Sequence, residues 1–488
     1  MATNAATKML TATAASLTHR RPLTCSAARL VPQPPDLMRW VRREGGFVHP
    51  SLKIADHTSH GLGLLSTEPI VHPSLKIADH TSHGLGLLST EPIADGSDLI
   101  ALPDHLPLRF DPQDEPESAL GRLAARVPVE LWAMRLGLRL LHERSKVGSS
   151  WWSYISNLPE TFSVPIFFSG EDIKNLQYAP LIHQVNKRCR FLLEFEKEIK
   201  SLLEGIASKD HPFEGKDVDA SSLGWAMSAV SSRAFRLHGD DSDVPMMLPL
   251  IDMCNHSFDP NARIVQEIDT GSSKMLVRVV AEKQIEQDTP ITLNYGCLSN
   301  DLFLLDYGFV IPENPFDHVE LRYDGALLDA ASMAAGVSSP SISSPEKWQQ
   351  EILSQLNLIG DGAVLKVTLG GSDLVDGRLL AALRLLLCND EDTVLNSDID
   401  ALKSLSAEAP LGVPTETAAL RTVVALCVVS LEYFPTKIMQ DESILKGDAS
   451  GSTKLAVQFR MQKKLMIIDV MRKLTQRIRT LSKEKSAA

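Results

Sequence analysis

The spacing of hydrophobic and polar residues changes character along the chain. Residues 36–109 carry short alternating stretches that are typical of strands and turns. From 110 to 240 the apolar residues recur at helical spacing, as in Val129–Leu141 and Val185–Leu203. The strand-and-turn pattern then returns over residues 241–325. This order predicts an α+β domain with a β-rich core that is interrupted by a helical insertion.

The last third of the chain has a different pattern. Residues 326–345, rich in Gly, Ser and Pro toward their end, are predicted to form a linker. Residues 346–488 contain the long amphipathic segments Leu379–Leu387, Leu420–Tyr433 and Leu455–Leu481. We therefore expect an all-α C-terminal domain.

Short strands are expected in both β-rich parts. Residues Leu99–Pro103 alternate and are predicted to pair back as a hairpin on the strand before them. The other predicted strands are Ser74–Ala78 and Leu85–Leu88, joined by the polar turn Asp79–Gly84, and Ala262–Val265, Met275–Val280 and Pro290–Leu293.

One segment occurs twice, because residues 48–70 are followed by an identical copy at 71–93. Two perfect copies do not make a solenoid, whose units diverge and number at least three. The second copy runs on to Gly96 and the closing strand, so we place the hairpin in it and expect the first copy to be an extruded loop. Such an insertion is tolerable because loop-closure entropy grows slowly with length.

Composition excludes several classes of protein. The chain is 44% hydrophobic and 23% charged, as globular proteins are, and its formal net charge of -12 argues against nucleic acid as a partner. No apolar stretch reaches the roughly 20 residues of a membrane helix, so no membrane partner is expected. The six cysteines form no C-x-x-C pair, which leaves neither a disulfide framework nor a four-thiolate zinc site.

Gly84-Leu85-Gly86, duplicated at Gly61-Leu62-Gly63, is the first candidate for chemistry. It lacks the third glycine and the following helix of a dinucleotide fingerprint. Two such glycines still provide a bend at which main-chain groups come close to a ligand.

Two further motifs lie in the second β-rich part. Leu248–Pro260 delivers Asn255 and His256 into a turn, where an amide and the main chain offer both donors and acceptors to an adenine or amino-acid group. In Ile291–Val310, Tyr295 and Tyr307 are flanked by glycines and are either core residues or channel walls.

Taken in order, these motifs resemble the SET-domain methyltransferases, in particular the branch that contains the Rubisco large-subunit lysine methyltransferase. The resemblance covers most of the chain, including the helical C-terminal part. The matching motifs are G-L-G-L followed by E-P-I-x-x-G-x-x-L-I-x-L-P, W-x-x-Y-I-x-x-L-P at Trp151–Pro159, S-S-R-A-F at Ser231–Phe235, the Asn-His-Ser turn, and N-Y-G-x-x-S-N-x-x-x-L-x-D-Y-G-F at Asn294–Phe309.

The resemblance implies a role for each matching position. It implies S-adenosylmethionine as the cofactor. The turn formed by His83, Gly84, Leu85 and Gly86 is expected to contact this cofactor, and Asn255 and His256 are expected to hold its adenine and methionine ends. Arg233 and Asp252 are expected on the substrate side. Tyr307 is the expected catalytic phenol and Tyr295 the second tyrosine of the channel. In that family the segment with the catalytic tyrosine passes beneath the Asn-His turn, which brings distant motifs together.

The implied reaction is protein-lysine N-methylation without a metal. The acceptor lysine, whose ordinary pKa is near 10.4, must first lose its proton. Lowering this pKa by about 3 units requires roughly 4 kcal/mol, which burial of the amine and the nearby positive sulfonium can provide. We therefore expect Tyr307 to orient the acceptor rather than to act as a strong base. His57, His60, His80 and His83 share a spacing but lack a third ligand set, so we expect no metal site.

Two other interpretations stay open. One is a catalytically silent relative that uses its helical domain to bind proteins, and the other is an enzyme with histidine as acceptor. The cysteine-rich zinc element of many histone-directed members is missing, which favours a non-histone substrate protein. The Rubisco large subunit or another stromal protein is compatible with the resemblance.

The first 35 residues resemble a targeting sequence for an organelle. Residues 1–35 contain no Asp or Glu, carry four basic residues and are rich in Ala, Ser and Thr, as organelle transit peptides are. The Ser, Thr and Ala content, with the family resemblance, favours the chloroplast stroma. A merely disordered N-terminus is the alternative.

Overall fold

The structure is a computed structural model of the whole chain, and it divides into two compact units. The residues that it describes are 23–24, 30, 35–56, 85–110, 116–207, 210–238, 243–268, 274–337, 342–388 and 390–487. Unit 1 comprises Met1–Glu171, His183–Cys297 and Leu302–Phe309. Unit 2 comprises Asp172–Ile182, Leu298–Asp301 and Val310–Ala488.

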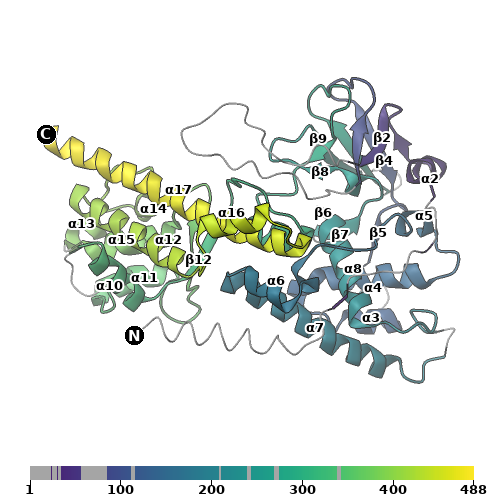
Figure 1. Ribbon diagram of the computed structural model, residues 1–488, viewed down its shortest axis with the longest axis horizontal. Helices are drawn as coiled ribbons and strands as arrows, with labels where there is room; N and C mark the ends of the chain where they lie inside the picture. Colours follow the sequence, from purple (N-terminus) through teal and green to yellow (C-terminus); the bar gives the residue numbers. More distant parts are fainter. Residues whose placement is uncertain are drawn as a thin grey trace. The chain divides into compact units, whose positions relative to one another are not determined.

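The strands of unit 1 form several small sheets, drawn as arrows in Figure 1. The largest sheet has the order β1-β4-β10-β9, another has the order β5-β7-β6, and two pairs are β2-β3 and β8-β11. Their bounds are β1 Phe47–Val48, β2 Leu52–Asp56, β3 Leu85–Ser89, β4 Asp98–Pro103, β5 Leu108–Arg109, β6 Ala234–His238, β7 Asp243–Met247, β8 Asn255–His256, β9 Ala262–Ile268, β10 Met275–Ala281 and β11 Thr292–Leu293.

Strand β10 is central in the largest sheet, and its sequence explains this position. Alternate residues from Met275 to Ala281 are buried, so one face of the strand points into the core. It pairs antiparallel with β9, where Arg278 lies opposite Val265, and with β4, where Val277 lies opposite Leu102. The β-rich part therefore closes around apolar side chains that come from both ends of its sequence.

Helices of the insertion pack together beside these strands in unit 1 (Figure 1). Helices α4 and α8 approach closely at Gly137, where an added Cβ would lie 3.5 Å from the Cβ of Ala226. The helical segments of unit 1 are α2 Leu37–Arg43, α3 Ala119–Ala124, η1 Val129–Leu131, α4 Trp132–Ser145, α5 Trp152–Ile155, η2 Pro165–Phe167, α7 Ala179–Leu203, α8 Ala220–Arg233, η3 Ile251–Met253 and η4 Phe303–Tyr307. Helix α7 belongs to unit 1 from His183 to its end. Two short helices, α6 Gly170–Asn175 and α9 Asn300–Leu302, lie where the chain passes between the units.

Unit 2 is mainly helical, with one antiparallel strand pair, β12 His318–Arg322 and β13 Lys366–Gly370. Its helices are α10 Gly325–Ala334, α11 Lys347–Gln355, α12 Gly377–Leu387, α13 Glu391–Leu395, α14 Ile399–Lys403, α15 Val413–Glu432, α16 Ile438–Lys446 and α17 Gly451–Ala487. Helix α15 has the length and hydropathy of a membrane span, but it packs against α17, α10 and α12, as the core helix of a helical unit does. The buried pair Arg384 and Glu416 joins α12 to α15 with Nε to Oε2 at 2.7 Å.

The α+β class and the helical C-terminal part are confirmed, but three local predictions were wrong. The described part of the first copy is not extruded, since its residues Leu52–Asp56 form β2 and pair with β3 from the second copy. Because the copies are identical, the local pattern cannot tell which strand fills the place next to β3. The predicted strand Ser74–Ala78 and turn Asp79–Gly84 lie outside the described residues.

The other two corrections concern strand β4 and the linker. Strand β4 does not pair back on β3 as a hairpin, because its neighbours are β1 and β10. The predicted linker 326–345 begins with helix α10, which is capped by Asp324 and buries Leu328 and Ala331. A side-chain cap and apolar residues at i and i+3 suffice to form this helix ahead of the Gly, Ser and Pro residues.

Candidate active site

Tyr295 stands just beyond β11 and is held at both ends. Its hydroxyl donates a hydrogen bond of 2.6 Å to the carbonyl oxygen of Cys254. Its main-chain N–H donates to Nδ1 of His256 at 3.1 Å. Burial is the main reason that the pKa of this phenol lies well above its ordinary value, so Tyr295 stays protonated at neutral pH.

Tyr307 ends the π-helical turn η4 and lies against Tyr295. The two rings are stacked, with centroids 5.1 Å apart and planes 22° apart. Burial raises the pKa of the Tyr307 phenol, and the charge of the adjacent Asp306 raises it further. Among the described residues, its hydroxyl has no hydrogen-bond partner. It is therefore a neutral phenol that is free to bind a ligand group.

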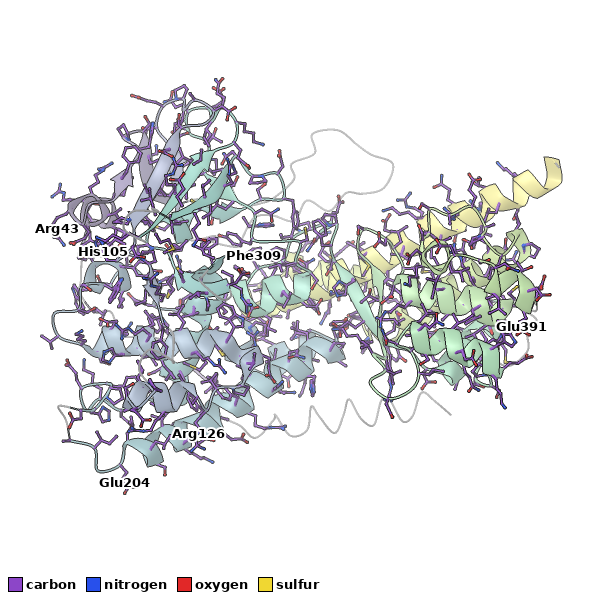
Figure 2. All side chains as sticks on the ribbon, turned by 180° about the vertical axis from the view of Figure 1, so that it is seen from behind. Arg43, His105, Arg126, Glu204, Phe309 and Glu391 are labelled. Atoms are coloured by element: carbon purple, nitrogen blue, oxygen red, sulfur yellow. The ribbon has the colours of Figure 1, made fainter. Side chains whose placement is uncertain are left out.

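Gly308 allows the chain to leave this turn. Its φ is +77°, in the left-handed region, where glycine is favoured. An added Cβ would lie 2.9 Å from the carbonyl oxygen of Ser163, so a side chain would also clash with the backbone there. The D-Y-G-F sequence thus contains a glycine because the turn that presents Tyr307 requires one. Figure 2 shows the next residue, Phe309, far from Arg43 at the end of α2.

Rings from several segments surround the two phenols. Phe235 meets Tyr295 edge-on at 6.2 Å. Phe303 and Phe309 each lie 5.9 Å from Tyr307. The tyrosines therefore sit in an aromatic cluster built from β6, the segment just beyond β11, and η4 with the residues that follow it. The sequence predicts no role for these three phenylalanines, although the motifs S-S-R-A-F and D-Y-G-F contain two of them, Phe235 and Phe309.

Arg233 and Asp252, expected together on the substrate side, are brought together in the structure. Arg233 ends α8, and its Nη1 lies 3.1 Å from Oδ2 of Asp252. The hydroxyl of the buried Tyr154 donates to the same oxygen at 2.8 Å. Burial raises the pKa of Asp252, and the positive charge of Arg233 opposes that rise. Tyr154 was missed, although it is the tyrosine of W-x-x-Y-I-x-x-L-P.

A strained residue sets the position of Asp252. Leu250 has a φ of +71° directly before the 3-10 turn η3, which carries Asp252. A bulky residue in this region costs on the order of 1–3 kcal/mol and persists where the surroundings hold it. Leu250 is fully buried, so core packing offsets this cost. The strain lies beside the candidate site, where such outliers often occur.

Asn255 and His256 form the short strand β8, which runs parallel to β11 with His256 opposite Leu293. The His256 ring faces inward and packs on Phe303 with centroids 4.9 Å apart, as well as accepting from the Tyr295 N–H. Burial lowers the pKa of His256 to about 4. Nδ1 accepts from the Tyr295 N–H, so the proton of the neutral ring is on Nε2. The His256 imidazole therefore holds the main chain at Tyr295. Asn255 is half-buried, and its side chain makes no hydrogen bond to a described residue.

The glycine turn is described only in part. His83 and Gly84 lie outside the described residues, while Leu85 and Gly86 begin β3, with Gly86 opposite Ala55. Strand β3 lies beside η3, and the Leu87 carbonyl accepts from the N–H of Ile291 at 2.9 Å. The strand that follows the glycine turn thus borders both the Asp252 turn and the segment that leads to Tyr295.

These groups suit chemistry on a cationic centre. Aromatic faces attract cations, and neutral phenols can orient an amine without taking its proton. Among the described residues, no three His, Cys, Asp or Glu side chains are grouped so that they could hold a metal ion. His57, His60, His80 and His83 fall outside those residues.

Comparison with known proteins agrees with this geometry. Residues 84–296 match the family described as SET domain, and residues 344–467 match the family described as Rubisco LSMT substrate-binding. A crystal structure of the SET domain of LSMT bound to lysine and AdoHcy superposes with a TM-score of 0.57 at 19% identity, covering 92% of both chains. The fold is that of a SET domain. A structure of Rubisco LSMT bound to AdoMet gives the same TM-score at 18% identity, covering 93% of this chain and 94% of the other.

Two curated relatives of this SET-domain chain differ in the acceptor that their names state. The ribosomal lysine N-methyltransferase set10 of Schizosaccharomyces pombe is 29% identical over 36% of this chain and 31% of its own length. The human actin-histidine N-methyltransferase is 26% identical over 88% of this chain and 66% of its own length. The chain thus spans about a third of the first relative and just under two thirds of the second.

Proposed function

We propose that this chain transfers a methyl group from S-adenosylmethionine to a lysine side chain of a non-histone protein. The observation that carries the proposal is the stacked pair Tyr295 and Tyr307 beside the Asn255-His256 strand. Segments far apart in the sequence supply these groups, and the SET fold brings them together. A site of neutral phenols and main-chain carbonyls can align a donor and an acceptor for in-line displacement.

The residues present fit the cofactor. When bound, S-adenosylmethionine supplies an electrophilic methyl group on a positively charged sulfur. The aromatic cluster around Tyr307 offers ring faces to such a cation. The side-chain amide of Asn255, without a partner among the described residues, offers both a donor and an acceptor. Solved structures of the same fold are described as bound to AdoMet or AdoHcy, which supports this choice.

The two phenols are proposed to orient the acceptor rather than to deprotonate it. Burial holds the pKa of both groups above the ordinary tyrosine value, so neither is an anion at neutral pH. The hydroxyl of Tyr295 is already donated to the Cys254 carbonyl, while that of Tyr307 is available. The acceptor lysine would lose its proton through desolvation and the nearby positive charge of the donor.

Lysine is favoured over histidine by the groups around Tyr307. An imidazole acceptor needs a hydrogen-bond partner for its second nitrogen, because an unpaired buried polar atom costs about 1–3 kcal/mol. The rings of Phe303 and Phe309, which lie against Tyr307, offer none, so in this aromatic group the Tyr307 hydroxyl alone could pair with that nitrogen and would then not be available to orient the acceptor. A lysine presents a single nitrogen at the end of an apolar stem, which suits an aromatic wall.

Histidine is the second candidate acceptor, since the human relative that matches 88% of this chain is named for it. The test is to incubate the purified chain with labelled S-adenosylmethionine and a plastid extract, then to locate the label by mass spectrometry. Methyl-lysine supports the proposal. Methyl-histidine would support the second candidate, and bound cofactor without transfer would indicate a silent binding module.

The compartment and the substrate protein are part of the same proposal. The acid-free, Ser- and Thr-rich residues 1–35 favour import into the chloroplast stroma. A stromal protein such as the Rubisco large subunit is then a reasonable substrate. A fluorescent protein fused after residue 35 should enter plastids in plant cells, and a cytosolic signal from this fusion would contradict the assignment.

A further inference from the structure

Arg188, in the middle of α7, reaches the turn that carries Tyr307. Its Nη1 lies 2.6 Å from Oδ1 of Asp306 and 3.4 Å from the carbonyl oxygen of Leu305. Both charged side chains are mostly buried, with 16% and 21% exposed. The insertion therefore delivers a charged group to the two residues immediately before the candidate catalytic phenol.

Main-chain hydrogen bonds close the end of this turn, from Gly308 N–H to the Leu304 carbonyl at 3.2 Å and from Phe309 N–H to the Phe303 carbonyl at 3.3 Å, whereas the Leu305 and Asp306 carbonyls accept from side chains. The π-helical turn Phe303–Tyr307 is one turn long and ends at Gly308. Carbonyl groups at a helix end lack partners within the helix, and a cation there satisfies them. Arg188 meets this need at Leu305 and also holds the side chain of Asp306. On the other side, the hydroxyl of Ser231 lies 3.4 Å from the Asp306 carbonyl.

A single nitrogen of Arg188, Nη1, contacts both acceptors. A lysine ammonium could therefore replace part of this contact, although it is a more compact charge on a different stem. Without the guanidinium, the mostly buried Asp306 carboxylate would lose its charged partner, and its side chain would rotate toward water. Because Asp306 and Tyr307 are neighbours in the same turn, that rotation would move the phenol ring relative to Tyr295.

We propose that Arg188 is a positioning residue for methyl transfer, holding the Tyr307 turn through Asp306 and Leu305. This inference rests on the proposed function of Tyr307. It gives the helical insertion a role in the reaction beyond packing, since α7 is otherwise an amphipathic helix of the insertion. It also explains why the residue before the phenol is an acid that is itself paired.

The experiment compares Arg188→Ala with Arg190→Ala, which removes an exposed arginine from the same helix. We expect Arg188→Ala to lower kcat between roughly 10- and 100-fold, since a misplacement of about 1 Å costs this much. KM for S-adenosylmethionine should stay within about twofold, because the Asn255 side of the site is untouched. Arg190→Ala should behave as wild type in both. Arg188→Lys should recover part of kcat, and it replaces the alanine variant if that one does not fold.

Hydrogen exchange gives a second readout that does not require activity. Amides of residues 303–309 should exchange faster in Arg188→Ala than in Arg190→Ala, while those of α4 should be unchanged. Wild-type exchange in residues 303–309, or a kcat equal to that of Arg190→Ala, would overturn the assignment. If the wild-type chain transfers no methyl group, the proposed function fails, but the exchange comparison still decides whether Arg188 holds the turn.

Discussion

Tyr307 stacks on Tyr295 with ring centroids 5.1 Å apart, although the two phenols belong to different segments and have different partners. Tyr295 gives its hydroxyl to the Cys254 carbonyl, whereas the hydroxyl of Tyr307 has no protein partner in the described part of the chain. The two rings are thus unequal. Tyr295 belongs to the scaffold of the site and Tyr307 has a free polar end, which leads to different expectations for their variants.

Tyr307→Phe should retain the stacked ring and lose the polar end. We expect kcat for methyl transfer to fall by on the order of 10²-fold, as when one orienting donor is removed from an active site. S-adenosylmethionine affinity, measured by calorimetry, should change little. Tyr323→Phe is the matched control, since it removes another buried hydroxyl from unit 2 and should leave kcat unchanged. Equal turnover in wild type and Tyr307→Phe would remove Tyr307 from its role.

Tyr295→Phe should act on stability and on the product. Loss of the hydroxyl leaves the Cys254 carbonyl without its partner, which costs about 1 kcal/mol of the free energy of unfolding. The space and water admitted next to the acceptor should also shift the products toward higher methylation. Denaturant unfolding and intact-mass analysis of the methylated protein check these two effects. An unchanged product distribution would show that Tyr295 does not bound the acceptor.

His256 makes the fold sensitive to acid. Burial lowers its pKa to about 4 from an ordinary value of 6.5, so the unfolded chain takes up a proton between these pH values while the folded chain does not. The stability contributed by the neutral ring is therefore complete above pH 6.5 and is lost as the pH falls toward 4. By pH 5 the loss is up to about 2 kcal/mol.

The variant His256→Gln tests this, because an amide cannot titrate but can still accept from the Tyr295 N–H. Its free energy of unfolding should fall less between pH 7 and pH 5 than that of wild type. His105→Gln, which alters an exposed histidine, should follow the wild-type curve. Parallel curves for wild type and His256→Gln would contradict the buried neutral ring.

Deleting residues 57–79 should stabilise unit 1. The deletion removes the surplus copy, keeps β2 and β3 intact and joins them through residues 80–84 in place of residues 57–84. Closing the shorter loop costs about 1.5 kcal/mol less entropy. We expect a higher melting temperature and unchanged pairing of Lys53 with Leu88, detectable by hydrogen exchange. A lower melting temperature would mean that residues 57–79 contribute contacts to the folded chain.

The sequence was most informative where one segment determines its own structure. Helices such as α4 and α12 follow from apolar periodicity, and Tyr295 and Tyr307 stand in motifs that already suggested a site. It was least informative where a choice depends on distant residues. The partners of β4 are β1 and β10, and no local pattern encodes them.

The repeat and Arg188 show two other reasons for failure. The two copies are identical, so their local sequence cannot show which copy supplies the strand that pairs with β3. Only the surrounding structure distinguishes them, because β2 in the first copy follows shortly after β1. Arg188 sits in an ordinary amphipathic helix among several basic residues, and nothing nearby in the sequence marks its contact with Asp306. The motifs marked Tyr295 and Tyr307 as candidate site residues, whereas the Arg188 contact that holds the Tyr307 turn is visible only in the folded chain.

Asn255, Tyr295 and Tyr307 must face one bound cofactor if the chain transfers methyl groups as proposed, and a crystal structure of the protein with S-adenosylhomocysteine tests this most directly. We predict that the side-chain amide of Asn255 contacts the cofactor and that its sulfur faces the Tyr307 hydroxyl. A cofactor bound elsewhere on the chain, with Tyr307 away from its sulfur, would contradict the proposed function.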